Sequence, residues 1–516
     1  MSMYDFTRRG LLQTGAAAGL IAGLPFTAAR AAAPKKGGTL RMGNSTGSTS
    51  DVLDPSLAGD PFTIPMVYGY ANNLTEIGAD GSLKPELAES WEATNKASVW
   101  TFQLRKGVEF HNGKTLDADD VVATFNYHRG EDSKSKVKSI ANSIKSVKAD
   151  GKHTVVFELE SGNADFAYIV SDYHFAILPS RDGVVDALGG VGTGPYTVDL
   201  FDPGVRIEMT RYPNYWKSDA AYFDAIKMLV ITDATARTNA LTTGEVDMMD
   251  RVELKTASLL AKNPNLVVEE KTGTQHYTLP MRCDTAPFDD VNVRMALKLL
   301  VDREAMLKTV LRGHGAVGND HPISPANQYF DASIPQRVYD PEKAKFHLKQ
   351  AGLDSLSVKL NVSDAGFGGA VDAAVLLAES ARKANVSIEI VREPADGYWD
   401  QVWMQKPWTA SYWGGRPTED WMFSTAYDSN AAWNESFWKN ERFDRLLLEA
   451  RVELDRAKRA DMYGEMQRLV RDDGGAIVPL FANYIWATST KIAHDSQVAS
   501  NWDMDGSKFM ERWWFA

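Results

Sequence analysis

The chain has 516 residues, of which 44% are hydrophobic and 24% charged, and its formal net charge is −12. This length exceeds what one hydrophobic core serves, so we expect two or three domains. The acidic balance argues against nucleic acid and anionic membrane surfaces as partners. The single cysteine, Cys283, excludes an intrachain disulfide, so the fold has to depend on its apolar core.

The first 33 residues are typical of an export signal. Arg8 and Arg9 precede an apolar run over 10–27, and small-residue cleavage motifs follow, the last ending at Ala33. The run is short and glycine-rich for a membrane span, so we predict a signal peptide cleaved near residues 31–33. The arginine pair resembles a twin-arginine signal, with an ordinary secretory signal as the alternative. Cleavage removes one aspartate and three arginines, which brings the net charge to about −14.

Strand and helix patterns alternate along the rest of the chain, which predicts an α/β fold. In the N-terminal half, strands are expected at 98–105, 153–160 and 224–232. Helices are expected after a cap at Asp117 and from Asp233 to about Gly244. Gly190–Gly194 is glycine-rich, but a strand-like segment follows it, so we predict a structural turn and no nucleotide loop.

In the C-terminal half, Asp340 and Pro341 predict the start of a helix that stops at Gly352. Strand patterns at 358–362 and 386–391 flank a helix at about 369–385, which predicts a parallel βαβ unit. A pair of amphipathic helices is expected over 440–472, followed by a returning strand.

Enzyme chemistry has weak support in the sequence. The nine histidines form no metal-binding pattern, and no nucleophile motif is present. The segment Asn501–Gly506 resembles a calcium loop, but its twelfth position is Arg512 where a glutamate is needed, so we predict a surface turn. Glu419 and Asp420 could serve glycoside hydrolysis only if they faced one another across a sugar. We therefore predict no metal and no cofactor.

Aromatic residues gather late in the chain. Seven of the fourteen tryptophans lie between Trp399 and Trp438, and the stretch SYWGGRPTEDW, residues 411–421, sets aromatics around an arginine and two carboxylates. Such side chains form the walls and anchors of ligand sites, although about half of the tryptophans are expected in the core.

The order of several motifs resembles the family 5 extracytoplasmic solute-binding proteins of ABC importers, the oligopeptide, dipeptide and nickel-binding type. The motifs are LKPELAESWEA (83–93), WTFQLRKGVEFHNGKTLDADDVVATFN (100–126), VGTGPYTV (191–198), RYPNYW (211–216), LTTGEVDMM (241–249), FDDVNVRMAL (288–297) and YDPEKAKFHLKQAG (339–352). The likeness runs from about Gly38 to the end of the chain.

This resemblance implies a bilobed periplasmic-binding-protein fold with a hinge and an extra subdomain. It predicts lobe I over 34–276, with the subdomain at about 80–185, lobe II over 277–483, and a return to lobe I over 484–516. A ligand would be enclosed between the lobes by hinge closure, which signals to a permease.

The resemblance also points to the 411–421 stretch as a ligand-binding loop. In peptide-binding members, an aspartate on this loop pairs with the α-ammonium group of the peptide. Here Arg416 takes that place, and an arginine favours a carboxylate. We predict Arg416 as the anchor, with Trp413, Tyr412 and Trp421 as walls, unless Arg416 serves a hinge or inter-lobe salt bridge.

Five further positions complete the predicted site. Glu419 and Asp420 are candidates to receive an amine, and the polar loop after the first strand contributes Asn44, Ser45 and Thr46. The implied function is a monomeric periplasmic receptor that delivers peptides to an ABC permease in the inner membrane. The alternatives are a receptor for a non-peptide carboxylate such as an opine-like conjugate, an exported enzyme, and a chaperone for extended chains.

Overall fold

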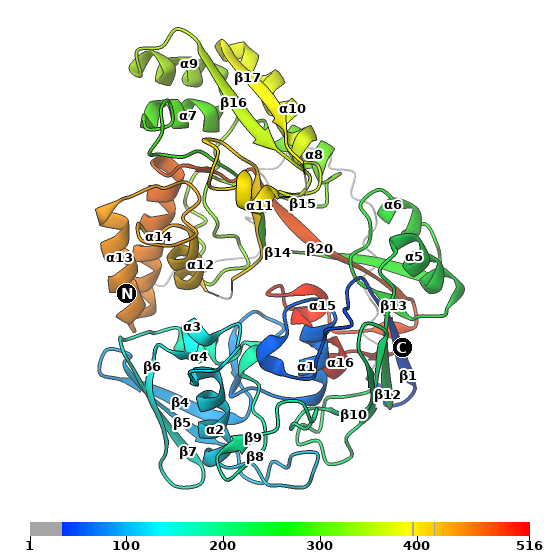
Figure 1. Cartoon of the computed structure of the whole chain (residues 1–516). Helices are drawn as coiled ribbons and strands as arrows, with labels where there is room; N and C mark the ends of the chain where they lie inside the picture. Colours follow the sequence, from blue (N-terminus) through cyan, green and yellow to red (C-terminus); the bar gives the residue numbers. More distant parts are fainter. Residues whose placement is uncertain (1–33, 395–396, 417) are drawn as a thin grey trace, which may run out of the picture.

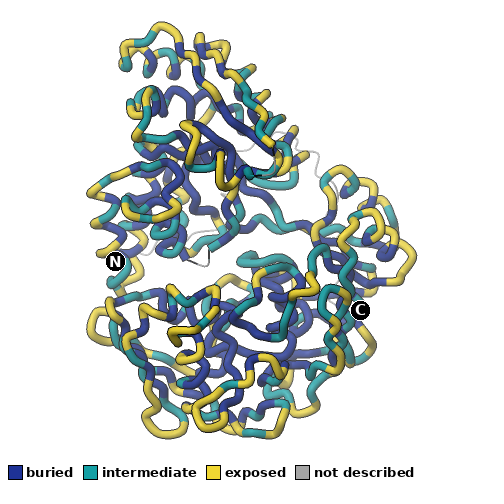
Figure 2. Tube along the Cα trace, in the orientation of Figure 1, coloured by how far each residue is buried: buried dark blue, intermediate teal, exposed yellow. Residues whose placement is uncertain are grey.

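The computed structural model describes residues 34–394, 397–416 and 418–516; the predicted signal peptide lies outside the described residues. Two lobes are joined by strands β14 (Leu266–Pro280) and β20 (Leu480–Ser489), which run from one lobe into the other (Figure 1). The buried segments gather inside each lobe (Figure 2), in agreement with separate apolar clusters. The predicted bilobed α/β fold is confirmed.

One large sheet extends through both lobes. In the described part of the chain it has ten strands, in the order β10–β11–β12–β1–β13–β20–β14–β18, with β15 on β20 and β19 on β14. Strand β1 is parallel to β12 and β13, so that Leu40 and Met42 lie beside Ile226 and Met228 in the core of lobe I. The remaining bounds are β1 (Thr39–Asn44), β10 (Tyr196–Asp202), β11 (Arg206–Arg211), β12 (Ala225–Val230), β13 (Met248–Met249), β15 (Gly315–Val317), β18 (Ser411–Trp413) and β19 (Ala476–Ile477).

Both ends of the described chain contribute to lobe I. Its other elements are α1 (Thr63–Tyr70), α5 (Ala234–Thr243), α6 (Ala257–Leu260), α15 (Asp503–Gly506), α16 (Phe509–Arg512), the 3-10 turns Pro55–Leu57 and Tyr173–Phe175, and the short pairs β8 (Ser180–Arg181) with β9 (Val184–Val185) and β21 (Ile492–Ala493) with β22 (Trp514–Phe515). Helix α5 ends at Gly244 as predicted. The expected surface turn at 501–506 is wrong, because Met504, Asp505 and Gly506 are buried in α15.

A separate four-stranded antiparallel sheet, β4–β5–β7–β6, carries its own apolar cluster. Its elements are β4 (Ala88–Thr94), β5 (Val99–Leu104), β6 (Ile144–Ala149), β7 (Thr154–Leu159), α2 (Ala118–Arg129), α3 (Lys138–Ala141) and α4 (Phe166–Ile169), with the pair β2 (Thr75–Ile77) and β3 (Leu83–Pro85) beside them. The strands predicted at 98–105 and 153–160 are therefore confirmed as β5 and β7. The subdomain boundary at about 80–185 stays a prediction.

Lobe II is mostly helical. It contains α7 (Val291–Leu299), α8 (Arg303–Val310), α9 (Pro341–Gln350), β16 (Leu356–Val362), α10 (Ala370–Ala381), the 3-10 turn Arg382–Ala384, β17 (Val386–Arg392), α11 (Tyr398–Gln401), α12 (Glu419–Ala426), α13 (Glu441–Val452) and α14 (Arg456–Asp472). Strands β16 and β17 are parallel with α10 between them, which confirms the predicted βαβ unit. Asp340 caps α9 by accepting from the Lys343 amide, and Pro341 opens the helix.

The connection between the lobes depends on β14 and β20. They pair from Leu266 with Ser489 as far as His276 with Phe481, and the register shifts between Thr272 and His276. At Gly273, inside this irregularity, a Cβ atom would lie 2.4 Å from the Tyr484 ring. The tight approach requires glycine there. The predicted lobe boundaries at 276/277 and 483/484 fall within these two strands, and their position stays a prediction.

Candidate ligand-binding site

The loop predicted to bind ligand begins on β18, the edge strand of the large sheet. Strand β18 pairs with β14, which sets Trp413 opposite His276 and Tyr412 opposite Tyr277. Because side chains alternate along a strand, Trp413 is buried and Tyr412 is 45% exposed. The indole N–H of Trp413 donates to Glu435 Oε1 over 3.0 Å. Trp413 is thus a fixed part of lobe II, whereas Tyr412 is free to contact a ligand.

Arg416 follows this strand and is partly buried. Its Nη1 donates to the carbonyl oxygens of Gly414 and Gly415, and its guanidinium carbon lies 5.8 Å from the centre of the Trp413 ring. Burial lowers the pKa of Arg416, while Tyr173 and Asp172 act in the opposite direction. Both of these residues belong to lobe I, so the Arg416 charge acts across the space between the lobes.

No carboxylate among the described residues lies within ion-pair distance of Arg416. Asp172 is directed elsewhere, because its Oδ1 accepts from the His174 amide and also contacts His174 Nδ1. A partly buried cation without a partner is costly. An anionic ligand would remove this cost.

Lobe I presents aromatic side chains to the same region. The Tyr173 ring lies edge-on to Trp502, with ring centres 6.1 Å apart. Thr274 on β14 has a buried hydroxyl oxygen with no hydrogen-bond partner among the described residues. A Cβ atom on Gly415 would lie 2.0 Å from that oxygen. Tyr173 and Thr274 are absent from the sequence-based site, because no local motif surrounds them. Only the fold brings Tyr173 and Thr274 to the Arg416 loop.

Glu419 and Asp420 lie in the first turn of α12 and are buried. Glu419 Oε1 accepts from the Tyr329 amide over 2.6 Å, and Asp420 Oδ1 accepts from Arg451 Nε over 3.0 Å. Burial raises the pKa of Glu419 to about 7 and that of Asp420 to about 6. Both carboxylates thus have partners within lobe II, and their predicted contact with a ligand amine stays a prediction.

Trp421 lies one residue further along α12 and is partly buried; its amide donates to the capping hydroxyl of Thr418. Near the start of the loop, the centre of the Trp399 ring lies 5.8 Å from that of Tyr412 and 5.7 Å from that of Trp403. Lobe II therefore presents a larger aromatic surface than the loop alone suggests. Trp399 is 39% exposed, and the clustering of tryptophans in the sequence could have identified it.

The polar loop after β1 lies at the end of a central strand of lobe I. Asn44 is fully buried and donates to the Pro61 carbonyl, while its own Oδ1 accepts from no residue in the part of the chain that the structure describes. Ser45 donates through its hydroxyl to Asp250 Oδ2 over 2.6 Å, and Thr46 donates to Asp60 Oδ1. These contacts hold the loop in place. A ligand-binding role for the three residues stays a prediction.

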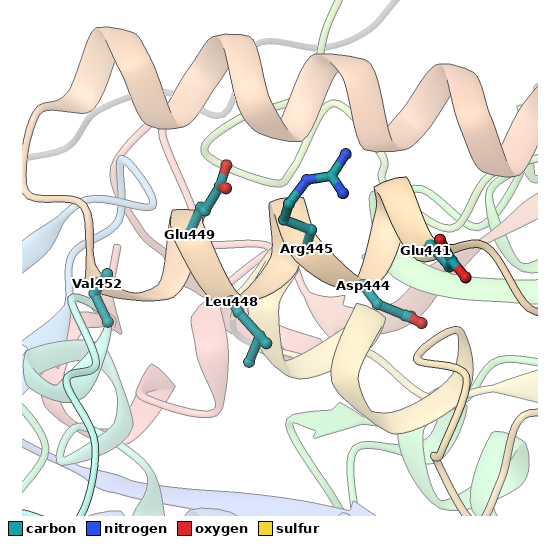
Figure 3. Close-up of a pocket in the computed structure, with 6 residues that line it drawn as sticks. All are labelled: Glu441, Asp444, Arg445, Leu448, Glu449 and Val452. Atoms are coloured by element: carbon teal, nitrogen blue, oxygen red, sulfur yellow. The ribbon is translucent and has the colours of Figure 1, made fainter.

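Two other features do not fit a binding site. The hollow of about 490 Å³ in Figure 3 is lined by residues of α13 alone, so it is an open groove along one helix face. Glu76, Glu86 and Glu511 have carboxylate oxygens within 4.8 Å of one another, as a metal site would need. Lys217, Lys508 and Arg512 already form ion pairs with this cluster, so a cation would have to displace them.

In the described chain, no helix is both long and apolar enough to cross a membrane.

Comparison with known proteins shows the family. The profile of the bacterial extracellular solute-binding proteins, family 5, matches residues 82–435. The chain belongs to this family, and it is a solute-binding receptor of an ABC importer. Its relatives are binding proteins of transporters.

Individual relatives cover nearly the whole chain. The dipeptide-binding protein of Escherichia coli (strain K12) is 28% identical over 502 residues, covering 88% of this chain and 91% of that one. The structure of HbpA2 from Haemophilus parasuis is similar with a TM-score of 0.81 at 22% identity, covering 92% of this chain and 99% of that one. The structure of AgaA with agropinic acid, from Agrobacterium tumefaciens R10, has a TM-score of 0.72 at 22% identity and covers 93% and 99%.

Proposed function

We propose that this receptor binds a small ligand through a carboxylate that pairs with Arg416, in the space between the lobes. The observation that carries the proposal is the Arg416 guanidinium, which is partly buried, has no carboxylate partner among the described residues, and donates only to the carbonyl oxygens of Gly414 and Gly415 in its own loop. A bidentate arginine–carboxylate pair would offset the cost of that burial.

Short peptides are the first ligand class, because the E. coli relative is named for dipeptides and every free peptide carries a terminal carboxylate. An opine-like conjugate is the second class. The family resemblance favours this alternative, since it implies that Arg416 replaces the aspartate of peptide-binding members, and the AgaA structure contains agropinic acid. We infer a periplasmic location, a removed signal peptide, a monomeric state and no enzymatic activity.

A matched set of probes tests the carboxylate. Protein that has been unfolded and refolded to remove bound molecules is titrated by calorimetry with Ala-Ala, with its C-terminal amide, and with agropinic acid. We expect a probe with a free carboxylate to bind, and the amide to bind at least tenfold more weakly than Ala-Ala if the ligand is a peptide. Equal binding of acid and amide would contradict the Arg416 anchor.

Variants of Arg416 separate anchoring from folding. Truncating one partner of a buried charged contact costs about 2–5 kcal/mol, so Arg416→Ala should weaken binding of the best probe about 30-fold or more. Arg442→Ala is the matched control, because Arg442 pairs with Glu465 on an exposed helix face. An Arg416→Ala protein that binds within a few-fold of the wild type would overturn the proposal.

A further inference from the structure

Besides the connecting strands β14 and β20, a buried ion pair joins the two lobes, at residues outside the proposed ligand site. Asp165 Oδ1 accepts from Arg459 Nη1 over 2.8 Å, and the two side chains are only 3% and 5% exposed. Next to this ion pair, the Ala164 amide donates to the Arg451 carbonyl over 2.7 Å. Residues 162–165 belong to the β4–β7 subdomain, and residues 450–459 form the corner between α13 and α14 in lobe II.

Arg459 is held in position by lobe II alone. Its Nε donates to the Ala450 carbonyl, Nη1 to the Tyr329 hydroxyl and Nη2 to the Tyr463 hydroxyl. Its guanidinium carbon also lies 5.0 Å and 5.4 Å from the centres of those two tyrosine rings. None of these partners belongs to the subdomain. The Arg459 side chain is therefore held ready to bind a carboxylate whether or not Asp165 is present.

Asp165 is held in position by its own subdomain in the same way. Its amide donates to Asn163 Oδ1, and its carbonyl accepts from the Tyr168 and Ile169 amides at the start of α4. Gly162 packs closely between the lobes: a Cβ atom there would lie 1.9 Å from the Lys96 carbonyl oxygen and 3.0 Å from Val452 Cγ1. The segment 162–165 is therefore held in position by its own subdomain and contacts a site on lobe II that is held in position by lobe II.

The contact lies far from the strands that connect the lobes. In Figure 1, α13 and α14 approach the β4–β7 sheet on the left, whereas β14 and β20 cross between the lobes toward the right. When two bodies rotate about a hinge, the points farthest from it separate most. The Asp165–Arg459 pair can thus exist only while the lobes are closed, and must separate when they open.

We propose that Asp165 and Arg459 form a latch that stabilises the closed form of the receptor and slows ligand release. The proposal rests on the receptor function, and it assigns these residues a positioning role away from the ligand. On opening, Asp165 enters water while Arg459 keeps its three hydrogen bonds within lobe II. The latch is therefore reversible, because neither partner is left as an isolated buried charge.

Distances between spin labels in the two lobes test the latch without knowledge of the ligand. Labels are attached through Lys148→Cys and Glu441→Cys, which are exposed positions in the subdomain and on α13, in a Cys283→Ser background. The labelled protein is measured as purified and after unfolding and refolding. We expect a population at short distance that Asp165→Ala lowers about tenfold relative to the open form, as expected for the loss of one charge-assisted hydrogen bond.

Two further measurements make the result decisive. Glu158→Ala is the matched control, because Glu158 forms an exposed ion pair with Lys145 in the same subdomain, and it should leave the distances unchanged. For any probe that binds, Asp165→Ala and Asp165→Asn should raise the dissociation rate constant about tenfold and leave the association rate constant nearly unchanged. A merely structural contact would change the unfolding midpoint without this separation of rates.

The latch is overturned if folded Asp165→Ala and Asp165→Asn proteins keep the wild-type distances and dissociation rates, or if the wild type shows no short-distance population in either preparation. These outcomes leave the Arg416 anchor untouched. Conversely, equal binding of Ala-Ala and its amide would remove the Arg416 anchor and leave the distance test of the latch valid.

Discussion

Glu419 shows what burial does to a single charged side chain. It is 2% exposed and accepts from the Tyr329 amide, yet burial dominates and raises its pKa to about 7. In the unfolded chain a glutamate has a pKa of about 4.3. The folded protein therefore keeps the Glu419 proton over a pH range in which the unfolded chain has lost it.

This difference predicts a pH dependence of stability. Between about pH 4.5 and 7 the folded state binds more protons at Glu419 than the unfolded state, so the free energy of unfolding falls as the pH rises. The full loss of unfolding free energy across this range is about 4 kcal/mol. We expect Glu419→Gln to lose this slope in urea unfolding curves recorded at pH 5 and pH 8, and Glu449→Gln, on the exposed face of α13, to retain it. Identical slopes in all three proteins would contradict the assignment.

At the same scale, the sequence indicated a candidate loop at 411–421, and its role in ligand binding stays a prediction. Arg416 on this loop is partly buried, and Tyr173 and Asp172 of lobe I act on its charge. Trp413 is predicted to form a wall of the ligand site, and its N–H donates to Glu435, which lies 22 residues later in the chain. Such a partner cannot be read from spacing, because the pairing depends on how separate segments pack.

Glu435 connects several elements of lobe II through one buried carboxylate. It accepts from the indole N–H groups of Trp403 and Trp413 and from the Thr278 hydroxyl on β14, over 2.7 to 3.0 Å. The residue is only 4% exposed. It thereby fixes β18, and with it the start of the Arg416 loop, against the large sheet.

Removing this carboxylate leaves three donors without an acceptor, of which Trp413 and Thr278 are buried and Trp403 is partly buried. An unpaired buried polar group costs about 1–3 kcal/mol, so we expect Glu435→Ala to lower the free energy of unfolding by several kcal/mol, and Glu435→Gln by less. Urea unfolding monitored by tryptophan fluorescence would measure both. Glu389→Ala, exposed on β17, is the control, and a Glu435→Ala protein as stable as this control would refute the role.

Elements with local signals were predicted well. Asp340 and Pro341 marked the start of α9, and the strand patterns at 358–362 and 386–391 gave the parallel pair β16–β17. The segment 501–506 was predicted incorrectly. Met504 and Asp505 adopt left-handed backbone angles inside α15, and the Ala499 amide donates to Asp505. That conformation is imposed by packing against the rest of lobe I, which a local pattern does not contain.

At the scale of the whole molecule, a buried ionic cluster ties the C-terminal segment to the first half of the chain. Lys508 donates to Glu86 over 2.6 Å and to Glu76 over 2.9 Å, while Lys217 donates to Glu511 over 2.6 Å. Arg512 adds a bond to Glu76. Three cations face the three glutamates, and Arg512 also pairs with the buried Asp505, so each buried charge has an opposite partner.

Breaking one member of this cluster should therefore affect both distant segments. Removing one partner of a buried ion pair costs about 3–5 kcal/mol, so Glu86→Gln should lower stability by this amount and speed amide hydrogen exchange in residues 503–516. Glu89→Gln, an exposed neighbour three residues later, should do neither. Unchanged exchange in 503–516 would show that the C-terminal segment is held by its apolar contacts alone.

The arrangement of lobes was predictable only through the family resemblance. Composition indicated several domains, and alternating patterns indicated an α/β fold, but the pairing of β1 with β13 and of β13 with β20 joins segments more than 200 residues apart. Pairing over such distances leaves no periodic trace in the sequence. The same holds for Tyr173 and Trp502, whose rings are in contact although they lie more than 300 residues apart in the chain.

The position of β20 between β13 and β14 has a consequence for synthesis. A ribosome releases residues 248–280 long before residues 480–489, so the two neighbours of β20 emerge with unpaired edges. The helices and the βαβ unit of lobe II, residues 291–472, are complete before that gap can be filled. Lobe I is therefore completed last, although its first strands are synthesised first. Until β20 is in place, the unpaired edges of β13 and β14 are exposed to aggregation, and a chaperone could protect them.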